Sequence, residues 1–242
     1  MGSISRAGDD AGSRGGWSAR RPGFPEIAVM ADGVGPLTGV VLAGGRAERM
    51  GGRDKGLLAL AGEPLVAHAV RSLRPQVAEV LISANRNLEA YRRFGCRVVQ
   101  DEEPERYRGP LAGILAALRA AGTAYVLTAP CDSPVLPPDY ARRMIGAVER
   151  ERAALAVAFH AGFWQPVFAL LPAALRDDLA SYLATGEGDA GRWLRRHRPA
   201  RAEFPDALAP FRNLNTPEEL SRLESGWAVA GKPALAEAPE RG

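Results

Sequence analysis

The sequence predicts an α/β fold in which helices cover both faces of a mostly parallel sheet. Between residues 39 and 152, short apolar runs alternate with longer segments whose apolar residues recur at helical spacing. The apolar runs are nearly continuous, which is typical of strands buried on both faces. Such strand–helix alternation indicates a doubly wound sheet with right-handed crossovers, and hence three αβα layers.

Turn and helix-start signals separate the expected elements of the first half. The four expected strands are residues 39–43, 79–83, 97–100 and 124–128. Pro64, Pro110 and Pro138 stand where helices begin, because proline suits the first helical turn, and Gly122 ends the helix that starts at Pro110. The expected helices are residues 64–73, 87–94, 110–121 and 138–152. This order predicts a Rossmann-like sandwich.

The second half of the chain departs from strict alternation. Residues 154–159 and 166–170 lie close together and predict a pair with antiparallel character, followed by helices at residues 173–184 and 191–197. Residues 1–36 show no hydrophobic period, and residues 225–242 are rich in Gly, Pro and Ala, so we expect both to be disordered tails. The expected folded unit is a single domain at residues 37–224.

Composition excludes several classes of protein. With 46% hydrophobic residues in 242, the chain can bury a full core and is not disordered throughout. The net charge of +3 is small and the arginines are scattered, unlike a nucleic-acid-binding surface. No apolar run of about 18 residues predicts a membrane span. Cys96 and Cys131 cannot form a disulfide framework, so we expect reduced thiols in a cytoplasmic protein.

Polar residues follow the expected strands at the edge where such sheets bind ligands. The first strand is followed by a glycine-rich loop at residues 44–56, and the later strands by Asn85, Asp101 and Asp132. The loop carries four cations, Arg46, Arg49, Arg53 and Lys55. Glycine lets backbone amides approach a phosphate, and cations neutralise its oxygens. The loop matches neither the Walker A pattern nor Gly-x-Gly-x-x-Gly, so it predicts a different type of phosphate site.

Five segments at these positions resemble those of the molybdenum cofactor guanylyltransferases. They are LAGGRAERMGGRDKG, ISANRN, GPLAG, PCDSP and NLNTPEEL, and the resemblance spans residues 37–223. The glycine pair Gly44 and Gly45, the spacing to Lys55 and the pair Asn213 and Asn215 favour this family. The related cytidylyltransferases have LAAG in the first loop.

The resemblance implies a nucleotidyltransferase that moves GMP from GTP to the terminal phosphate of molybdopterin, with release of pyrophosphate. It implies nucleotide contacts from Leu42, Ala43, Gly44, Gly45, Lys55, Asn85, Asp101 and Asp132. It places Lys55, Arg49 and Asp132 in the catalytic machinery, Mg²⁺ on Asp132, and Asn213 and Asn215 on the acceptor side. It also implies a cytoplasmic enzyme with GTP and molybdopterin as partners, without nucleic acid or membrane, that transiently contacts molybdenum-insertion or molybdoenzyme proteins.

Elementary chemistry agrees with this reaction. A phosphate monoester has a second pKa of about 6, so the nucleophile is already ionised near neutral pH. The enzyme then needs positioning and charge neutralisation more than a general base. His68, His160 and His197 fall at none of the loop sites. Mg²⁺ takes one or two carboxylates besides phosphate oxygens, which suits Asp132, with Asp101 as a possible second group.

Each candidate residue also has a purely structural interpretation. Asp132 could cap a turn or helix between Pro130 and Pro134, and Asp101 could lie in a solvated turn. Asn85 could cap the helix at residues 87–94. Asn215 could cap a helix that begins near Pro217. Cys131 is expected to be a small packing residue.

The second half departs from the family pattern at two places. The family has an Asp-Gly-x-Arg stretch just before the strand that contains Pro166, where this chain has His160-Ala161-Gly162-Phe163-Trp164-Gln165. The family has a basic pair after Gly186, where this chain has Glu187-Gly188-Asp189-Ala190-Gly191. Arg192, Arg195 and Arg196 could substitute for the basic pair or form a solvated helix face. Two other functions therefore stay open: a nucleotidyltransferase of the same fold that uses CTP or a sugar phosphate, and a non-catalytic nucleotide- or cofactor-binding protein.

Overall fold

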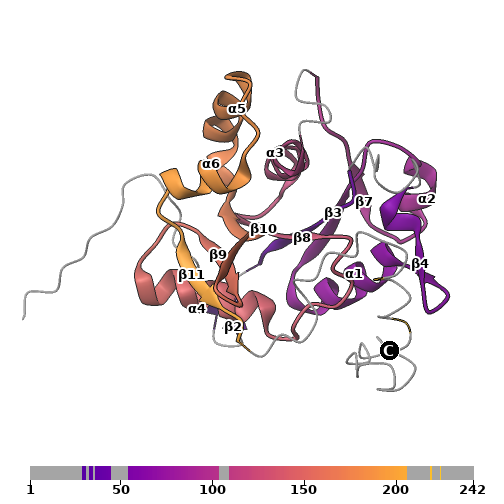
Figure 1. Cartoon of the computed structure of the whole chain (residues 1–242), viewed down its shortest axis with the longest axis horizontal. Coiled ribbons are helices and arrows are strands. Elements are labelled where there is room, and N and C mark those ends of the chain that lie inside the picture. Colours follow the sequence, from indigo (N-terminus) through magenta and orange to yellow (C-terminus); the bar gives the residue numbers. More distant parts are fainter. Residues whose placement is uncertain are drawn as a thin grey trace, which may run out of the picture.

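A seven-stranded sheet runs through the centre of the protein (Figure 1). The computed structural model describes residues 29–30, 33–34, 36–44, 54–103 and 109–205, with Glu219 and Glu224. The strand order is β11-β9-β10-β8-β3-β6-β7. The strands are β3 (Thr38–Leu42), β6 (Glu79–Ser83), β7 (Arg97–Val99), β8 (Tyr125–Pro130), β9 (Ala156–His160), β10 (Phe163–Pro172) and β11 (Ala200–Glu203).

One strand runs against the others. β10 is antiparallel to both of its neighbours, β8 and β9, whereas β8, β3, β6 and β7 pair in parallel, as do β9 and β11. The mostly parallel sheet with an antiparallel element in the second half is thus confirmed. β8 and β9 both oppose β10 and therefore point the same way, so the ends of β3, β6, β8 and β9 share one edge of the sheet.

Helices cover both faces of the sheet, which confirms the three-layer Rossmann-like sandwich (Figure 1). One face is covered by α1 (Leu65–Leu73), α2 (Leu88–Arg92) and α4 (Tyr140–Glu151). The other is covered by α3 (Pro110–Ala120), α5 (Arg176–Ala184) and α6 (Ala190–Arg196). β3 is buried along its whole length because it is covered on both faces.

Short elements complete the described structure. Three 3₁₀ turns, η2 (Lys55–Leu57), η3 (Arg74–Gln76) and η4 (Ala173–Leu175), stand at the ends of loops or helices. Two small antiparallel pairs form, β1 (Val29–Met30) with β2 (Gly33–Val34), and β4 (Ala59–Leu60) with β5 (Glu63–Pro64). Most residues of the two expected tails lie outside the described ranges, so the domain limits at residues 37 and 224 stay predictions.

The sequence located the long elements but missed some short ones. The strand expected at residues 79–83 is β6, and the expected pair near residues 154–170 is β9 with β10. β11 was missed, because its ARAE pattern is only four residues long and half exposed. α4 begins at Tyr140, two residues later than expected. No described helix is both long and apolar enough to cross a bilayer.

Candidate active site

The carboxyl ends of four parallel strands are tied together by backbone hydrogen bonds beyond the strands themselves. Ala43 N donates to Ser83 O at 2.8 Å, Cys131 N to Leu42 O at 3.0 Å, and Ala84 N to Val99 O at 3.0 Å. The residues after β3, β6, β7 and β8 therefore lie side by side along one edge. This edge carries the described members of the predicted site.

Lys55 and Asp132 form an ion pair at this edge. Lys55 Nζ donates to Asp132 Oδ2 at 2.6 Å, and the side chains are 20% and 14% exposed. Asp139, and not Asp132, occupies the N-cap position of α4, so the interpretation of Asp132 as a helix cap is wrong. The structure brings together the predicted phosphate-binding cation and the predicted metal ligand.

Asp54 anchors the end of the glycine-rich loop next to Lys55. Its carboxylate accepts hydrogen bonds from Tyr91 Oη and, at 2.9 Å, from Asn87 Nδ2, and Arg86 Nε lies 3.6 Å away. A Cβ on Gly56 would lie 2.5 Å from Tyr91 Oη, so only glycine leaves room for this ring. Burial and the bond to Asp54 raise the pKa of Tyr91, which therefore stays a donor. Sequence reasoning did not single out Asp54 or Tyr91, although Asp54 directly precedes Lys55.

Asn85 and Asp101 form a buried pair. Asn85 Nδ2 donates to Asp101 Oδ2 at 2.7 Å, and the Asp101 backbone amide donates to Asn85 Oδ1 at 2.9 Å. Both residues are less than a tenth exposed, so Asp101 is not in a solvated turn. Asn87 takes the N-cap position of α2, which shows that the capping interpretation of Asn85 was wrong. A Cβ on Gly44 would lie 3.2 Å from Asn85 Nδ2, so the glycine-rich loop begins directly against this amide.

The GPLAG segment packs α3 closely against the same edge. Gly109, at the N-cap, has φ 75° and ψ −163°, a backbone conformation that suits glycine. Pro110 follows at the first helical position. A Cβ on Gly113 would lie 2.4 Å from Ser83 Oγ and 3.3 Å from Leu42 Cδ2. The two glycines thus let α3 start and pack beside the ends of β3 and β6.

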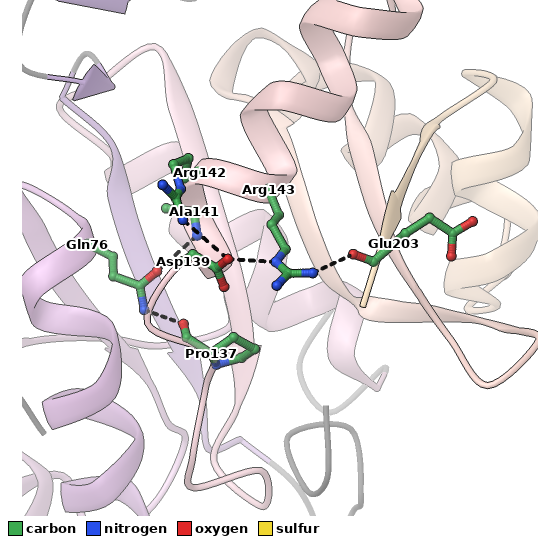
Figure 2. A network of polar contacts seen from close by, with 7 residues as sticks. All are labelled: Gln76, Pro137, Asp139, Ala141, Arg142, Arg143 and Glu203. Carbon is green, nitrogen blue, oxygen red and sulfur yellow. Dashed lines mark hydrogen bonds and ion pairs between the residues drawn. The ribbon is translucent and has the colours of Figure 1, made fainter. Parts of the chain in front are cut away.

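The segment between Asp132 and α4 is held by α1 and η3, which lie on the face of the sheet opposite to α3. Ser72 Oγ donates to Pro134 O at 3.2 Å, and Gln76 Nε2 donates to Pro137 O at 2.9 Å. Figure 2 shows that Gln76 also accepts a bond from the Ala141 amide, at 3.0 Å, in the first turn of α4. One glutamine side chain therefore joins the end of this segment to the start of the helix.

A second set of contacts in Figure 2 continues toward β11. Arg143 Nε donates to Asp139 Oδ2 at 2.7 Å, and Arg143 Nη1 lies 3.5 Å from Glu203 O. Burial alone would raise the pKa of Asp139, but the hydrogen bonds and charges of Arg143 and Arg142 outweigh it and lower that pKa. The start of α4 is thus tied to the carboxyl end of β11.

Cys131 is a packing residue, as expected. It is buried in the core that α1 and α4 share. Burial, with a smaller contribution from the charge of Asp132, raises the pKa of its thiol. A protonated, buried thiol is a poor nucleophile.

The carboxylate of Asp132 has spare capacity for a cation. Within the described part of the chain, Asp132 Oδ1 and Ser133 Oγ are buried and have no hydrogen-bond partner. No group of three or more His, Cys, Asp or Glu side chains gathers there as a metal site. A single carboxylate oxygen suits Mg²⁺ that is held mainly by phosphate oxygens and water, but not a cation caged by protein ligands.

Some predicted site residues lie outside the described ranges. Gly45, Arg49, Asn213 and Asn215 are among them, and their roles stay predictions. The described candidates, Leu42, Ala43, Gly44, Lys55, Asn85, Asp101 and Asp132, all lie along the one edge.

One of the departures in the second half, Asp189, has a structural explanation. Asp189 caps α6, because its Oδ1 accepts a bond from Arg192 N at 2.9 Å. Arg192 pairs with Glu187 at 2.6 Å, and the Arg196 guanidinium lies 5.5 Å from the centre of the Tyr182 ring. Arg192 and Arg196 therefore contact their own surroundings, which favours the solvated-face interpretation for these two arginines.

Comparison with known proteins decides the family. The family model described as the MobA-like NTP transferase domain matches residues 39–201. A molybdenum cofactor guanylyltransferase of Shewanella sediminis is 44% identical over 192 residues, which cover 79% of this chain and 97% of that protein. One of Ralstonia nicotianae is 47% identical, over 77% of this chain and 95% of its own length. The chain belongs to the molybdenum cofactor guanylyltransferase family.

As a molybdenum cofactor guanylyltransferase family member, the protein is a nucleotidyltransferase enzyme. Its fold is shared with solved structures of low sequence identity. The molybdopterin-guanine dinucleotide biosynthesis protein A of Archaeoglobus fulgidus has a TM-score of 0.65 at 23% identity, over 79% of this chain and 99% of that one. A nucleotidyl transferase of Methanothermobacter thermautotroptrophicus has a TM-score of 0.62 at 22% identity, over 81% and 99%.

Proposed function

We propose that this enzyme transfers GMP from GTP to the terminal phosphate of molybdopterin and releases pyrophosphate. The relatives named for this activity support the proposal. The observation that carries it in this chain is the Lys55–Asp132 pair beside the buried Asn85–Asp101 pair. The first pair suits a triphosphate, and the second offers amide and carboxylate groups to a nucleoside.

The proposed mechanism assigns separate tasks to the residues along the edge. Leu42, Ala43, Gly44 and Gly45 contact the nucleotide, and Asn85 and Asp101 also contact GTP. Lys55 turns from Asp132 to the phosphates, where its charge offsets negative charge that builds up during transfer. Arg49 acts in the same way from the glycine-rich loop. Asn213 and Asn215 serve the acceptor.

We propose Mg²⁺ as the metal, held by Asp132. Oδ1 of this residue is buried without a partner among the described side chains, and so fits a hard cation. When bound, Mg²⁺ would neutralise part of the phosphate charge. The acceptor phosphate is ionised near neutral pH, so the chain need only hold it in line with the α-phosphate of GTP. The free cysteines fit a reducing cytoplasm, where transient contact with molybdenum-insertion or molybdoenzyme proteins would deliver the product.

The test is anaerobic incubation of the protein with GTP, Mg²⁺ and molybdopterin, followed by mass spectrometry of the product. We expect the guanine dinucleotide cofactor and pyrophosphate. Parallel reactions with CTP, and with a sugar phosphate as acceptor, test the other nucleotidyltransferase activities. Nucleotide binding without pyrophosphate release would indicate a non-catalytic binding protein and contradict the proposal.

A further inference from the structure

The β9–β10 hairpin reaches the same edge of the sheet as Asp132. The end of β9 and the start of β10 lie at this edge, because β9 runs in the same direction as β8. A two-residue turn joins them, with Ala161 at φ 50° and Gly162 at φ 85°, as in the tight turns that suit hairpins. β10 lies next to β8, on the side away from β3, β6 and β7. Asp132 thus stands between the nucleotide-side segments and this hairpin.

Two large apolar side chains are exposed where β10 begins. Phe163 is 71% exposed and Trp164 is 43% exposed, and no other large hydrophobic residue in the described part of the chain is exposed. Exposed aromatic rings cost solvation free energy, and a pair of them at a ligand-binding edge is a feature of recognition surfaces.

The two rings point to opposite faces of the sheet. Across the hairpin, Trp164 pairs with Phe159, and Phe163 pairs with His160. Residues that pair directly project from the same face of the sheet. Along β9, Ala156 and Ala158 belong to the core under α4, so His160 and Phe163 lie on that face too. Phe159 and Trp164 lie on the opposite face.

Contacts separate the roles of the two rings. The Trp164 ring meets that of Phe159 edge-on at 5.5 Å, and the Arg201 guanidinium lies 4.6 Å from the centre of the Phe159 ring. Trp164 therefore braces the hairpin against β9 and β11. Phe163 lies on the face toward which the segment after Asp132 runs, since that segment contributes Leu136 to the core under α4. His160, paired with Phe163, is fixed by a contact of 2.7 Å between Nδ1 and Phe204 O.

We propose that Phe163 is the stacking surface for the flat pyrimidine ring of the acceptor's pterin and so helps to determine which class of acceptor the enzyme takes. This rests on the proposed function, which requires an acceptor that is both heteroaromatic and phosphorylated. Its phosphate must reach the α-phosphate of GTP near Asp132, and the hairpin lies beside β8 on the side opposite to the nucleotide segments. A phenyl ring can stack on the face of such a heterocycle whatever groups the edge of the heterocycle carries. The stack therefore favours heteroaromatic acceptors as a class.

Two matched substitutions on adjacent residues test the proposal. Phe163→Leu and Trp164→Leu both replace an aromatic ring by an aliphatic side chain, but on opposite faces. We expect Phe163→Leu to raise the KM for molybdopterin by about five- to a hundredfold, the range of a lost base–aromatic stack. The KM for GTP should change less than about twofold. Trp164→Leu should lower the thermal midpoint and leave the KM for molybdopterin within about threefold. Phe163→Tyr, which keeps the stacking ring, should restore most of the molybdopterin binding that Phe163→Leu loses.

Equilibrium binding of molybdopterin without nucleotide, measured anaerobically by dialysis, provides a readout that does not need turnover. Weaker binding to Phe163→Leu, but not to Phe163→Tyr, supports the stacking role even if the wild-type enzyme proves to use another nucleotide. Equal binding to wild type and Phe163→Leu overturns the proposal, although product formation by the wild type would still uphold the proposed function. A selective rise in the KM for GTP, or an equal effect of Trp164→Leu on molybdopterin binding, also overturns it.

Discussion

Lys55 Nζ lies 2.6 Å from Asp132 Oδ2, although 77 positions separate the two residues in the chain. The cation proposed for the phosphates and the carboxylate proposed for the metal thus neutralise each other in the protein without ligands. In the proposed mechanism, a nucleotide with its metal would replace this pair with two new ones, Lys55 with phosphate and Asp132 with the cation. The pair therefore keeps a partly buried site ready without leaving either charge uncompensated.

Replacing Lys55 by alanine should weaken GTP binding and turnover by about ten- to a hundredfold. The loss corresponds to one charged hydrogen bond to a phosphate, worth about 1.5–3 kcal/mol. Lys55→Arg retains the charge and should lose less. Titration calorimetry with GTP and steady-state kinetics measure both effects. Wild-type kinetics in a folded Lys55→Ala protein would show that the ion pair with Asp132 is its whole role.

Asp132→Asn preserves the shape of the side chain and removes the charge that a hard cation needs. We expect turnover to collapse. The thermal midpoint without ligands should fall only slightly, because the asparagine side-chain oxygen can still accept a hydrogen bond from Lys55, whose side chain is 20% exposed and so partly solvated. Activity assays over a range of Mg²⁺ concentrations, with circular dichroism melts, give both quantities. Full activity at ordinary Mg²⁺ concentration would contradict the metal assignment.

Gln76→Ala should lower both stability and activity, since Gln76 bonds Pro137 and Ala141 at the end of the segment that carries Asp132. Gln76 Nε2 also donates to Ser72 O at 3.0 Å, and three lost hydrogen bonds correspond to about 1.5–4.5 kcal/mol in the free energy of unfolding. If the glutamine also positions Asp132, the Mg²⁺ concentration for half-maximal activity should rise at temperatures where the variant is fully folded. Arg142→Ala, an exposed neighbour of the same network, is the control and should change neither. An unaltered Mg²⁺ requirement would limit Gln76 to a structural role.

Gly113→Ala should destabilise the protein, although alanine is the better helix former. The added Cβ would lie 2.4 Å from Ser83 Oγ at the buried end of β6. Gly146→Ala in α4 is a matched control, because nothing lies within 4 Å of its Cβ position. That change should stabilise by about 0.5–1 kcal/mol. Denaturant unfolding compares the two, and the double change Gly113→Ala with Ser83→Ala should recover part of the loss. Equal stabilisation by both glycine replacements would show that α3 does not pack as closely as described.

The order of strands and helices was predictable because each long element repeats a local pattern. Buried strands such as Glu79–Ser83 appear as nearly continuous apolar runs. Pro110 marks the start of α3, and Gly122 lies two residues after its last residue, Ala120. The edge strand β11 was not predictable, since its four residues gain their pairing only from contact with β9. Intrinsic propensity over four residues is too weak to indicate such a strand.

The sequence by itself determined which residue types gather at the ligand edge, because motifs after parallel strands meet wherever those strands end. Lys55, Asn85, Asp101 and Asp132 could be named without coordinates for that reason. Only the tertiary structure decided their partners: Lys55 with Asp132, and Asn85 with Asp101 in place of a helix cap. It also placed Phe163 and Trp164 on opposite faces of a hairpin beside β8. Hydrogen bonds and ring contacts act over a few ångströms, and folding brings residues within that range across separations that no local sequence pattern records.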